Sequence, residues 1–334
     1  MTPTLKPGSD PAAPPSTGAP TRASTLPSTL MGPGWRPRTA SHAEDIAGGE
    51  IWGTYGVGSP VAPLTAVLLT WPGDNLAFHG DPSDWLMDAR PDLPRMREEA
   101  EGLADAYRSR GVEVRWIRAE GHAPPNLVFA CDLMFMTPQG AVLARMAAQQ
   151  RAGEERHAAA ALAAAGIPIL ATPVGHATFE GADAMWLADD LVVVGLGRRT
   201  NEAGFRAVGR VLADQGVQCV GVDLPPTVQH LLGAVNLVDR DLAVAWDATP
   251  ALRATLAEAG VRTLDFVDDD EVVHGRALNF VTLAPRSVLM PAGNPRTRRR
   301  LEAAGIEVTE RAVSQYLRAA GGIGCLTGIL GRAG

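Results

Sequence analysis

The strongest constraint in this sequence is a unit of roughly fifty residues that recurs along the chain. Four apolar stretches are each interrupted by a polar turn, as in a β-hairpin: LVFACDLMFMTPQGAVLARM, DAMWLADDLVVVGLG, HLLGAVNLVDRDLAVAW and NFVTLAPRSVLMPA. Their turns fall at Pro138, Asp189, Asp239 and Pro285. Spacing this regular indicates one supersecondary unit used several times.

Each hairpin is followed by a run that favours helix, then by a glycine and one more short apolar segment. The glycines that end the predicted helices are Gly166, Gly216, Gly260 and Gly305. The strands predicted after them are IPILATP, VQCVGVDLP, VRTLDFVD and IEVTER. An irregular further copy consists of LTAVLLTWP, a helix near 95–110 and VEVRWIRA. The chain therefore reads as five ββαβ units.

Five closely linked units are too few for an open solenoid with polar ends, so closure into a ring is the natural arrangement. The predicted fold is an α/β, fivefold pseudo-symmetric ββαβ propeller, with helices outside and strand ends around a central channel. A doubly wound α/β sheet is the alternative. It does not predict a hairpin before every helix, and no GxGxxG follows a strand here.

The two ends of the chain differ in composition. Residues 1–44 are rich in Pro, Ser and Thr and carry too little apolar surface to offset the entropy of ordering, so we predict a disordered tail. Residues 45–334 are predicted to form a single catalytic α/β-propeller domain. Met31 is an alternative to Met1 as the start of translation, and the sequence leaves both open.

Charge and cysteine content exclude several classes of protein. A net charge of -7 argues against nucleic acid as a partner. Cys131, Cys219 and Cys325 are widely separated, which suggests neither a disulfide framework nor a zinc site and fits a reducing cytoplasm. The longest apolar runs are far too short to cross a membrane. We expect a cytoplasmic protein with no membrane partner, no metal and no organic cofactor; a homodimer is compatible with the sequence.

Several polar residues lie within or at the ends of the predicted strands. Asp132 interrupts an apolar pair of strands, where a carboxylate is costly unless it is paired or used. Glu180 and Asp183 lie in FEGAD before the second hairpin, where turn formation is the alternative explanation. His230 opens the third hairpin, although a lone histidine beside apolar residues is commonly a core residue. Arg199 precedes a helix start, where a solvated surface charge is the usual role.

The last of these residues is Cys325, in AAGGIGCLTGIL near the end of the chain. A buried thiol beside a glycine turn would explain it equally well. However, Asp132, Glu180, His230 and Cys325 occupy equivalent places in four successive units. A cysteine, a histidine and two carboxylates converging on one channel can perform nucleophilic catalysis on a cationic carbon.

These motifs resemble the guanidino-group-modifying enzymes, the pentein superfamily of arginine deiminases, dimethylarginine dimethylaminohydrolases and amidinotransferases. FEGAD resembles the family's FEGGD segment, GRRTN its Arg-Thr motif, QHLL with VDRDL its histidine hairpin, and GGIGCLTGIL its nucleophile segment. The resemblance runs from about residue 64 to the end of the chain and implies a fivefold propeller.

The resemblance also implies roles for single residues. Cys325 would be the nucleophile, His230 the general acid and base, and Glu180 and Asp132 the carboxylates that hold a guanidinium. Arg199 would bind the substrate's α-carboxylate. Asp183 and Gly324 would line the substrate site, with the glycines letting a planar guanidinium approach the thiol.

The implied activity is hydrolysis of a guanidino group, in arginine or an N-substituted arginine, through a covalent thiouronium. An amidinotransferase and a non-catalytic binding propeller are the alternatives. HLL at 230–232 lacks the His-x-Asp of deiminases and transferases, as in the dimethylaminohydrolases, which favours an enlarged guanidine. Gly324 replaces a larger residue of several family members, which implies a more open pocket.

Overall fold

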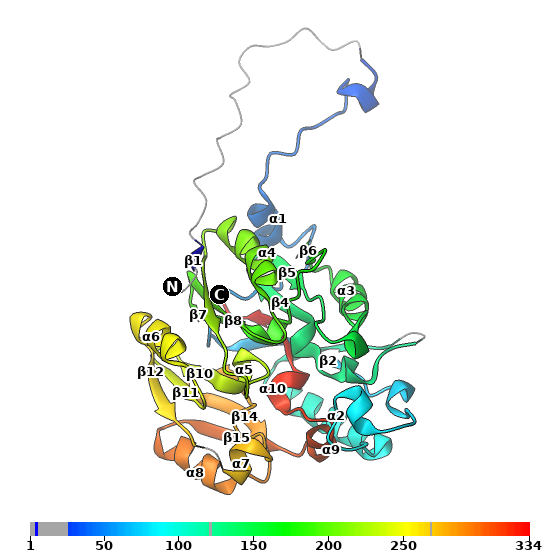
Figure 1. Cartoon of the computed structure of the whole chain (residues 1–334). Helices are drawn as coiled ribbons and strands as arrows, with labels where there is room; N and C mark the ends of the chain where they lie inside the picture. The colour runs from blue at the N-terminus through cyan, green and yellow to red at the C-terminus, as the bar shows by residue number, and fades with distance from the viewer. Residues whose placement is uncertain (1–3, 6–25, 120–121, 268) are drawn as a thin grey trace.

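The chain forms five small sheets arranged around a central axis (Figure 1). The computed structural model describes residues 4–5, 26–119, 122–267 and 269–334. Every sheet contains a three-strand unit in which the first strand is antiparallel to the second and the second is parallel to the third. The predicted fivefold ββαβ propeller is therefore confirmed.

Four of the sheets are built from consecutive strands. Their strands are β4 (Met134–Thr137), β5 (Gly140–Leu143) and β6 (Ile169–Ala171); β7 (Ala184–Ala188), β8 (Leu191–Leu196) and β9 (Gln218–Asp223); β10 (Val235–Asp239), β11 (Leu242–Ala245) and β12 (Arg262–Asp265); and β13 (Val281–Ala284), β14 (Ser287–Pro291) and β15 (Glu307–Arg311). The two-residue strand β1 (Thr4–Leu5) pairs with β9.

The fifth sheet joins the two ends of the propeller. It contains β16 (Gly328–Arg332), β2 (Leu64–Thr70) and β3 (Glu113–Ile117). β16 runs antiparallel to β2, with Ile329 opposite Val67. The unit that looked irregular in the sequence is thus complete in space, because its first strand comes from the far end of the chain. This pairing closes the ring.

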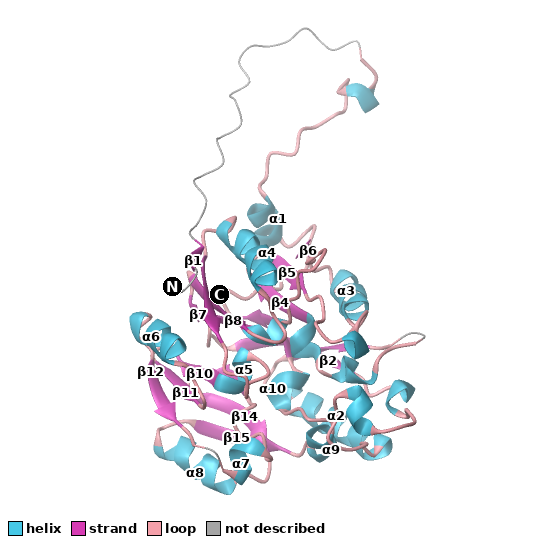
Figure 2. Cartoon of the chain, in the orientation of Figure 1, coloured by secondary structure: helices cyan, strands magenta, loops and turns pink. Residues whose placement is uncertain are grey.

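One helix connects the second and third strands of each unit and packs on the outside of the ring (Figure 2). These helices are α2 (Leu93–Arg108), α3 (Glu155–Ala164), α4 (Glu202–Ala213), α6 (Pro250–Glu258) and α8 (Pro295–Ala303). Two short helices, α5 (Leu231–Ala234) and α10 (Ile323–Leu326), lie near the centre instead (Figure 1). The remaining helices are α1 (His42–Gly48), α7 (Asp270–Val273) and α9 (Ser314–Arg318).

A glycine in the left-handed region follows each outer helix, as the sequence predicts. The φ angles are 76° at Gly111, 71° at Gly166, 75° at Gly216, 75° at Gly260 and 77° at Gly305. Other residues adopt this conformation only at an energetic cost, so the glycine stops the helix and turns the chain toward the third strand.

Most of the predicted tail at 1–44 lies outside the described residues. Its described parts include β1 and a short 3-10 turn at Ser28–Leu30. Helix α1 begins at His42, with the Ser41 hydroxyl accepting a hydrogen bond from the Glu44 backbone N–H. The His42 ring contacts the Gln139 carbonyl at 3.0 Å, so this helix is already attached to the propeller.

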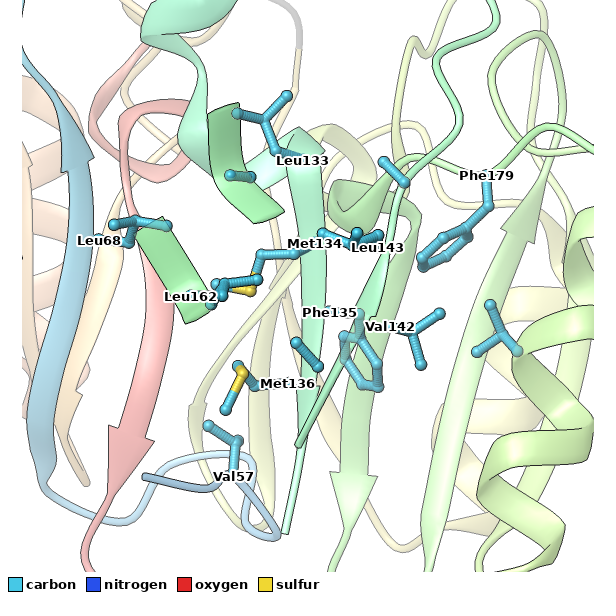
Figure 3. Close-up of a cluster of buried hydrophobic side chains, with 14 of the residues drawn as sticks. Val57, Leu68, Leu133, Met134, Phe135, Met136, Val142, Leu143, Leu162 and Phe179 are labelled. Atoms are coloured by element: carbon cyan, nitrogen blue, oxygen red, sulfur yellow. The ribbon is translucent and has the colours of Figure 1, made fainter. Parts of the chain in front are cut away.

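Apolar side chains from the strands fill the space between sheets and outer helices. Figure 3 shows Met134 and Met136 on one side of β4 and Phe135 on the other, as the alternation of a strand requires. All three are buried, as are Val142 and Leu162 on the neighbouring strand and helix. Within the described part of the chain, no helix is long and apolar enough to cross a membrane.

We predict that Gly216→Ala lowers the free energy of unfolding by about 1 kcal/mol, because alanine is strained at positive φ. No atom outside its chain neighbours lies within 4 Å of the added Cβ, so the loss would reflect backbone conformation alone. The matched control is Gly102→Ala inside α2, which also has open space and should be neutral or stabilising. Urea denaturation of both variants measures the difference; equal effects would contradict the assigned role.

Candidate active site

The innermost strands of the five units begin at the same end of the channel, and a polar residue precedes each one. These residues are Asp132 before β4, Glu180 before β7, His230 before β10, Asn279 before β13 and Cys325 before β16. Four of the five are predicted from the sequence. Asn279 was missed, although it opens the predicted hairpin NFVTLAPRSVLMPA at the equivalent place and its position in the repeat could have identified it.

Glu180 and His230 are joined by a hydrogen bond at the centre of the site. The His230 Nε2 lies 2.7 Å from the Glu180 Oε2, and its Nδ1 lies 3.9 Å from the Asp132 Oδ1. The three side chains are almost completely buried, with exposed fractions of 6%, 0% and 3% for His230, Glu180 and Asp132. The Ala147 backbone N–H also donates to the Glu180 Oε1 at 3.0 Å, which fixes the carboxylate.

These contacts favour the charged forms of the buried pair. Burial disfavours an ionised Glu180, but the hydrogen bond and charge of His230, with Arg151 and Arg199 nearby, lower the pKa of this carboxyl group. Burial likewise opposes a charge on His230. The surrounding carboxylates, first Asp132, outweigh it and raise the pKa of the imidazole. At neutral pH the site therefore holds an imidazolium beside a carboxylate.

Asp183 connects two neighbouring segments of the site by hydrogen bonds. Its Oδ2 accepts a hydrogen bond from the Thr200 hydroxyl at 2.7 Å, and its Oδ1 accepts one from the Leu231 backbone N–H at 3.0 Å. Burial raises its pKa to about 6. Asp183 thus ties the His230 segment to the chain beside Arg199, and a direct role in substrate binding stays a prediction.

Arg151 is the charged residue of the site that sequence reasoning missed. Its guanidinium lies 2.6 Å from the Asp132 Oδ2, 2.8 Å from the Glu154 Oε2 and 3.6 Å from the Glu180 Oε2. Only 2% of its side chain is exposed. Burial raises the pKa of Glu154 to about 7, although Arg151 counteracts this effect. In the sequence Arg151 lies in a polar, helix-like run, and nothing there distinguishes it from a surface arginine.

Cys325 is held by both ends of the Asn279 amide. The Asn279 Nδ2 donates to the Cys325 Sγ at 3.0 Å, and its Oδ1 accepts from the Cys325 backbone N–H at 2.9 Å. Burial and the charge of Asp132 raise the pKa of the thiol, whereas Asn279 and the Gly322 backbone lower it. The resting thiol is consequently neutral and would ionise more readily beside a cation.

The glycines around Cys325 make room for Asn279. A Cβ on Gly324 would lie 2.9 Å from the Asn279 Oδ1, and a Cβ on Gly322 would lie 2.8 Å from the Asn279 Cβ. Among the residues that the structure describes, Gly324 does not line the cleft that contains Cys325. Packing therefore accounts for this glycine, and its predicted contact with substrate stays a prediction.

Cys325 opens onto a cleft of about 320 Å³. The polar side chains that line it are Asn126, Asp132, Arg151, Arg199, Gln229 and Cys325. Arg199 is 13% exposed, and its closest ion-pair contact is the Glu180 Oε1 at 3.5 Å. The Oδ1 of Asp132 is buried without a hydrogen-bond partner. A buried anionic oxygen without a donor is costly, so this atom is available to a cationic ligand.

Asp132, Glu180 and His230 are also the candidate metal ligands, since one donor atom of each lies within 4.8 Å of the others. Two of these atoms are already joined by the hydrogen bond between Glu180 and His230. Arg151 donates to the third residue, Asp132. Hydrogen bonds and ion pairs thus account for the cluster, and the expectation of no metal stays a prediction.

The known proteins that this chain resembles in sequence include arginine deiminases. A profile of the arginine deiminase family matches residues 122–249, which include Asp132, Glu180 and His230. An uncharacterized protein of Aeropyrum pernix is 28% identical over 190 residues, covering 56% of this chain and 66% of the relative. An arginine deiminase of Rhodococcus erythropolis is 28% identical over 241 residues, covering 61% of this chain and 59% of the relative.

Solved structures share the fold. A dimethylarginine dimethylaminohydrolase of Pseudomonas aeruginosa in complex with citrulline has a TM-score of 0.65 and 22% identity, covering 79% of this chain and 98% of the other. The N-terminal domain of ArgZ, a cyanobacterial arginine dihydrolase, bound to substrate, has a TM-score of 0.68 and 18% identity, covering 80% of this chain and 98% of the other.

The five-unit ring has the fold of these solved pentein structures, and the sequence matches support the resemblance to the pentein superfamily that the motifs predict. The arginine deiminases are one family of that superfamily, and their profile covers less than half of this chain. This chain matches only part of the length of its curated relatives. The matched part is 66% of the Aeropyrum pernix protein, 59% of the Rhodococcus erythropolis deiminase and 46% of an arginine deiminase of Mycobacterium marinum.

We predict that Arg151→Met lowers the free energy of unfolding by about 3–5 kcal/mol, because it leaves two buried carboxylates without their cation. Arg199→Met is the matched control. It removes the same charge from the same cleft, but its one ion-pair contact with the described residues is long, so a loss below about 1 kcal/mol is expected. Urea denaturation at pH 7 checks both, and similar losses would contradict a structural role for Arg151.

The stability contributed by His230 should depend on pH. Its pKa is raised in the folded protein, so the contribution is complete below the unfolded pKa of about 6.5 and is lost as pH rises through the folded pKa. We expect the difference in free energy of unfolding between wild type and His230→Asn to be larger at pH 6 than at pH 10, by about 2 kcal/mol. A difference independent of pH would show that the histidine is neutral.

Proposed function

We propose that this protein is a cysteine-dependent hydrolase of a guanidino group. The observation that carries the proposal is the buried Oδ1 of Asp132, which accepts no hydrogen bond from the described residues and lies in the same cleft as Cys325. A guanidinium is planar, cationic and rich in N–H donors, so it satisfies this oxygen and offsets the negative charge of Asp132 and Glu180. The arginine deiminase profile and relatives support the same class of substrate.

The reaction begins when the cationic substrate lowers the pKa of Cys325. The thiol proton leaves to solvent, and the thiolate attacks the guanidinium carbon to form a tetrahedral adduct. Asp132 and Glu180 hold the reacting group, and Asn279 orients the sulfur. The His230 imidazolium donates its proton to the departing nitrogen, which leaves as ammonia or an amine and breaks the C–N bond.

The covalent thiouronium is then hydrolysed. Neutral His230 takes one proton from water as the water oxygen bonds to the carbon. The C–S bond then breaks, and the second proton of the water leaves to solvent as the carbonyl forms. The products are a ureido compound and the regenerated thiolate, so water supplies the new oxygen.

Arg199 is the proposed ligand of the substrate's α-carboxylate. Arg151 is less suited to this role, because Asp132 and Glu154 already pair with its guanidinium. Arginine is the simplest substrate that carries both a guanidinium and a carboxylate. An N-substituted arginine is the alternative within the same class, favoured by Leu232 at the position where deiminases carry an aspartate.

We predict that Cys325→Ser abolishes release of the ureido product while Cys219→Ser, a change at a buried cysteine of the core, keeps most of the activity. The wild-type protein, incubated in oxygen-18 water with arginine and with N-methylated arginines, should turn over many times and place one labelled oxygen in each product. Mass spectrometry measures label and yield. Agmatine, which lacks the carboxylate, should react at least ten-fold more slowly.

Two results would contradict the proposal. Loss of activity in a folded Cys219→Ser protein equal to that in Cys325→Ser would exclude Cys325 as the specific nucleophile. A single burst of ornithine, with turnover restored by an added amine and no labelled ureido product, would indicate an amidinotransferase.

A further inference from the structure

The channel contains a second cavity, next to the cleft of Cys325. Its empty volume is about 810 Å³, with the open solvent at its mouth included. Residues from the innermost strand of every unit line it, together with a segment before β2: Met134, Ala184, Asn236, Val281, Gly328 and Val57. Gly324 belongs to this lining, whereas its neighbour Cys325 belongs to the cleft. Nothing in the proposed reaction uses this cavity.

The walls of the cavity are predominantly apolar. Met134, Met136, Trp186 and Ile329 lie along them. Figure 3 shows Met134, Met136 and Val57 on the same side of β4. Trp186 donates its indole N–H to the Met136 carbonyl at 3.2 Å, so it presents its apolar ring without an unsatisfied donor. Walls of this apolar composition, with a few polar groups among them, are typical of a site for a small organic molecule.

Arg332 is the only charged side chain among the described residues that line this cavity. It ends β16, at the opposite end of that strand from Cys325. Its Nη1 donates to the Ala62 carbonyl at 2.6 Å and its Nη2 to the Thr282 carbonyl at 2.9 Å. In the described part of the chain, no carboxylate forms an ion pair with it.

Arg332 thus has no counter-charge among the residues that the structure describes. Burial lowers its pKa to about 10, and Tyr107 acts in the opposite direction. At neutral pH the side chain is still a cation, and its guanidinium retains N–H donors beyond the two used by the carbonyls. An apolar cavity with one unpaired cation is complementary to a molecule with an apolar body and one negative charge.

We propose that the cavity is a second ligand site that binds an amphipathic monocarboxylate, with the carboxylate on Arg332 and the apolar chain along the methionines and Trp186. The site is distinct from the cleft, and its occupancy does not depend on the proposed hydrolase activity.

The test uses octanoate and 1-octanol, which share an apolar chain and differ in charge. Isothermal titration of the wild-type protein at pH 7.5 should give at least ten-fold tighter binding for octanoate. Arg332→Met should weaken octanoate at least ten-fold and leave octanol nearly unchanged. Arg199→Met, the matched change in the cleft, should leave the affinity for octanoate unchanged.

A second variant tests the site independently, in case Arg332→Met does not fold. Val57→Phe enlarges a side chain of the lining without touching the charge, and it should weaken octanoate and octanol alike by several-fold. Circular dichroism and thermal melting establish that each variant is folded. The proposal is overturned if octanoate does not bind up to 1 mM, if octanol binds equally well, or if Arg199→Met rather than Arg332→Met removes binding.

Discussion

Pairing of β16 with β2 is the interaction on which the rest of the structure depends. It closes the ring between segments near opposite ends of the chain and fixes the start of β16, where Cys325 lies. The Tyr107 hydroxyl and the Thr327 Oγ1, 2.8 Å apart and buried, attach the same segment to the outer helix α2. Without this closure, the cysteine would have no fixed relation to the carboxylates and histidine of the other units. A closed ring also removes the exposed edges that its two terminal units would otherwise present.

The buried charges form one network in which each group shifts the pKa values of its neighbours. Arg151 pairs with Asp132 and Glu154, Glu180 bonds to His230, and burial makes each of these contacts stronger than it would be in water. Such a network is expensive to assemble, since each charge loses hydration. It is retained at the end of the channel where the candidate nucleophile lies, which is the pattern expected of a catalytic site.

The channel has two compartments of opposite chemical character. The cleft is lined by the carboxylate of Asp132 and the guanidinium groups of Arg151 and Arg199 beside a thiol. The walls of the neighbouring cavity are mainly apolar, and Arg332 is the one cation among the described residues that line it. The short helix α10 separates them: Gly324 contributes to the cavity and Cys325 to the cleft. Because Gly324 has no side chain, Asn279 can approach closely enough to hold the sulfur. The glycine-rich sequence around the cysteine is thus explained mainly by packing between the units.

The sequence by itself determined the repeat, the helix-ending glycines and the equivalent places of Asp132, Glu180, His230 and Cys325 within the repeat, because hairpin turns, helix ends and the spacing of apolar residues are encoded locally. Four of the five residues that precede the innermost strands were predicted in this way. Only the tertiary structure decided which distant charges meet. Arg151 reads as a surface arginine until the fold buries it, and Arg332 reads as a terminal charge until ring closure places it in the channel. Asn279 could have been predicted from its place in the repeat, but its bonds to Cys325 join two units. Contacts between units depend on how the ring closes, and no local pattern specifies that.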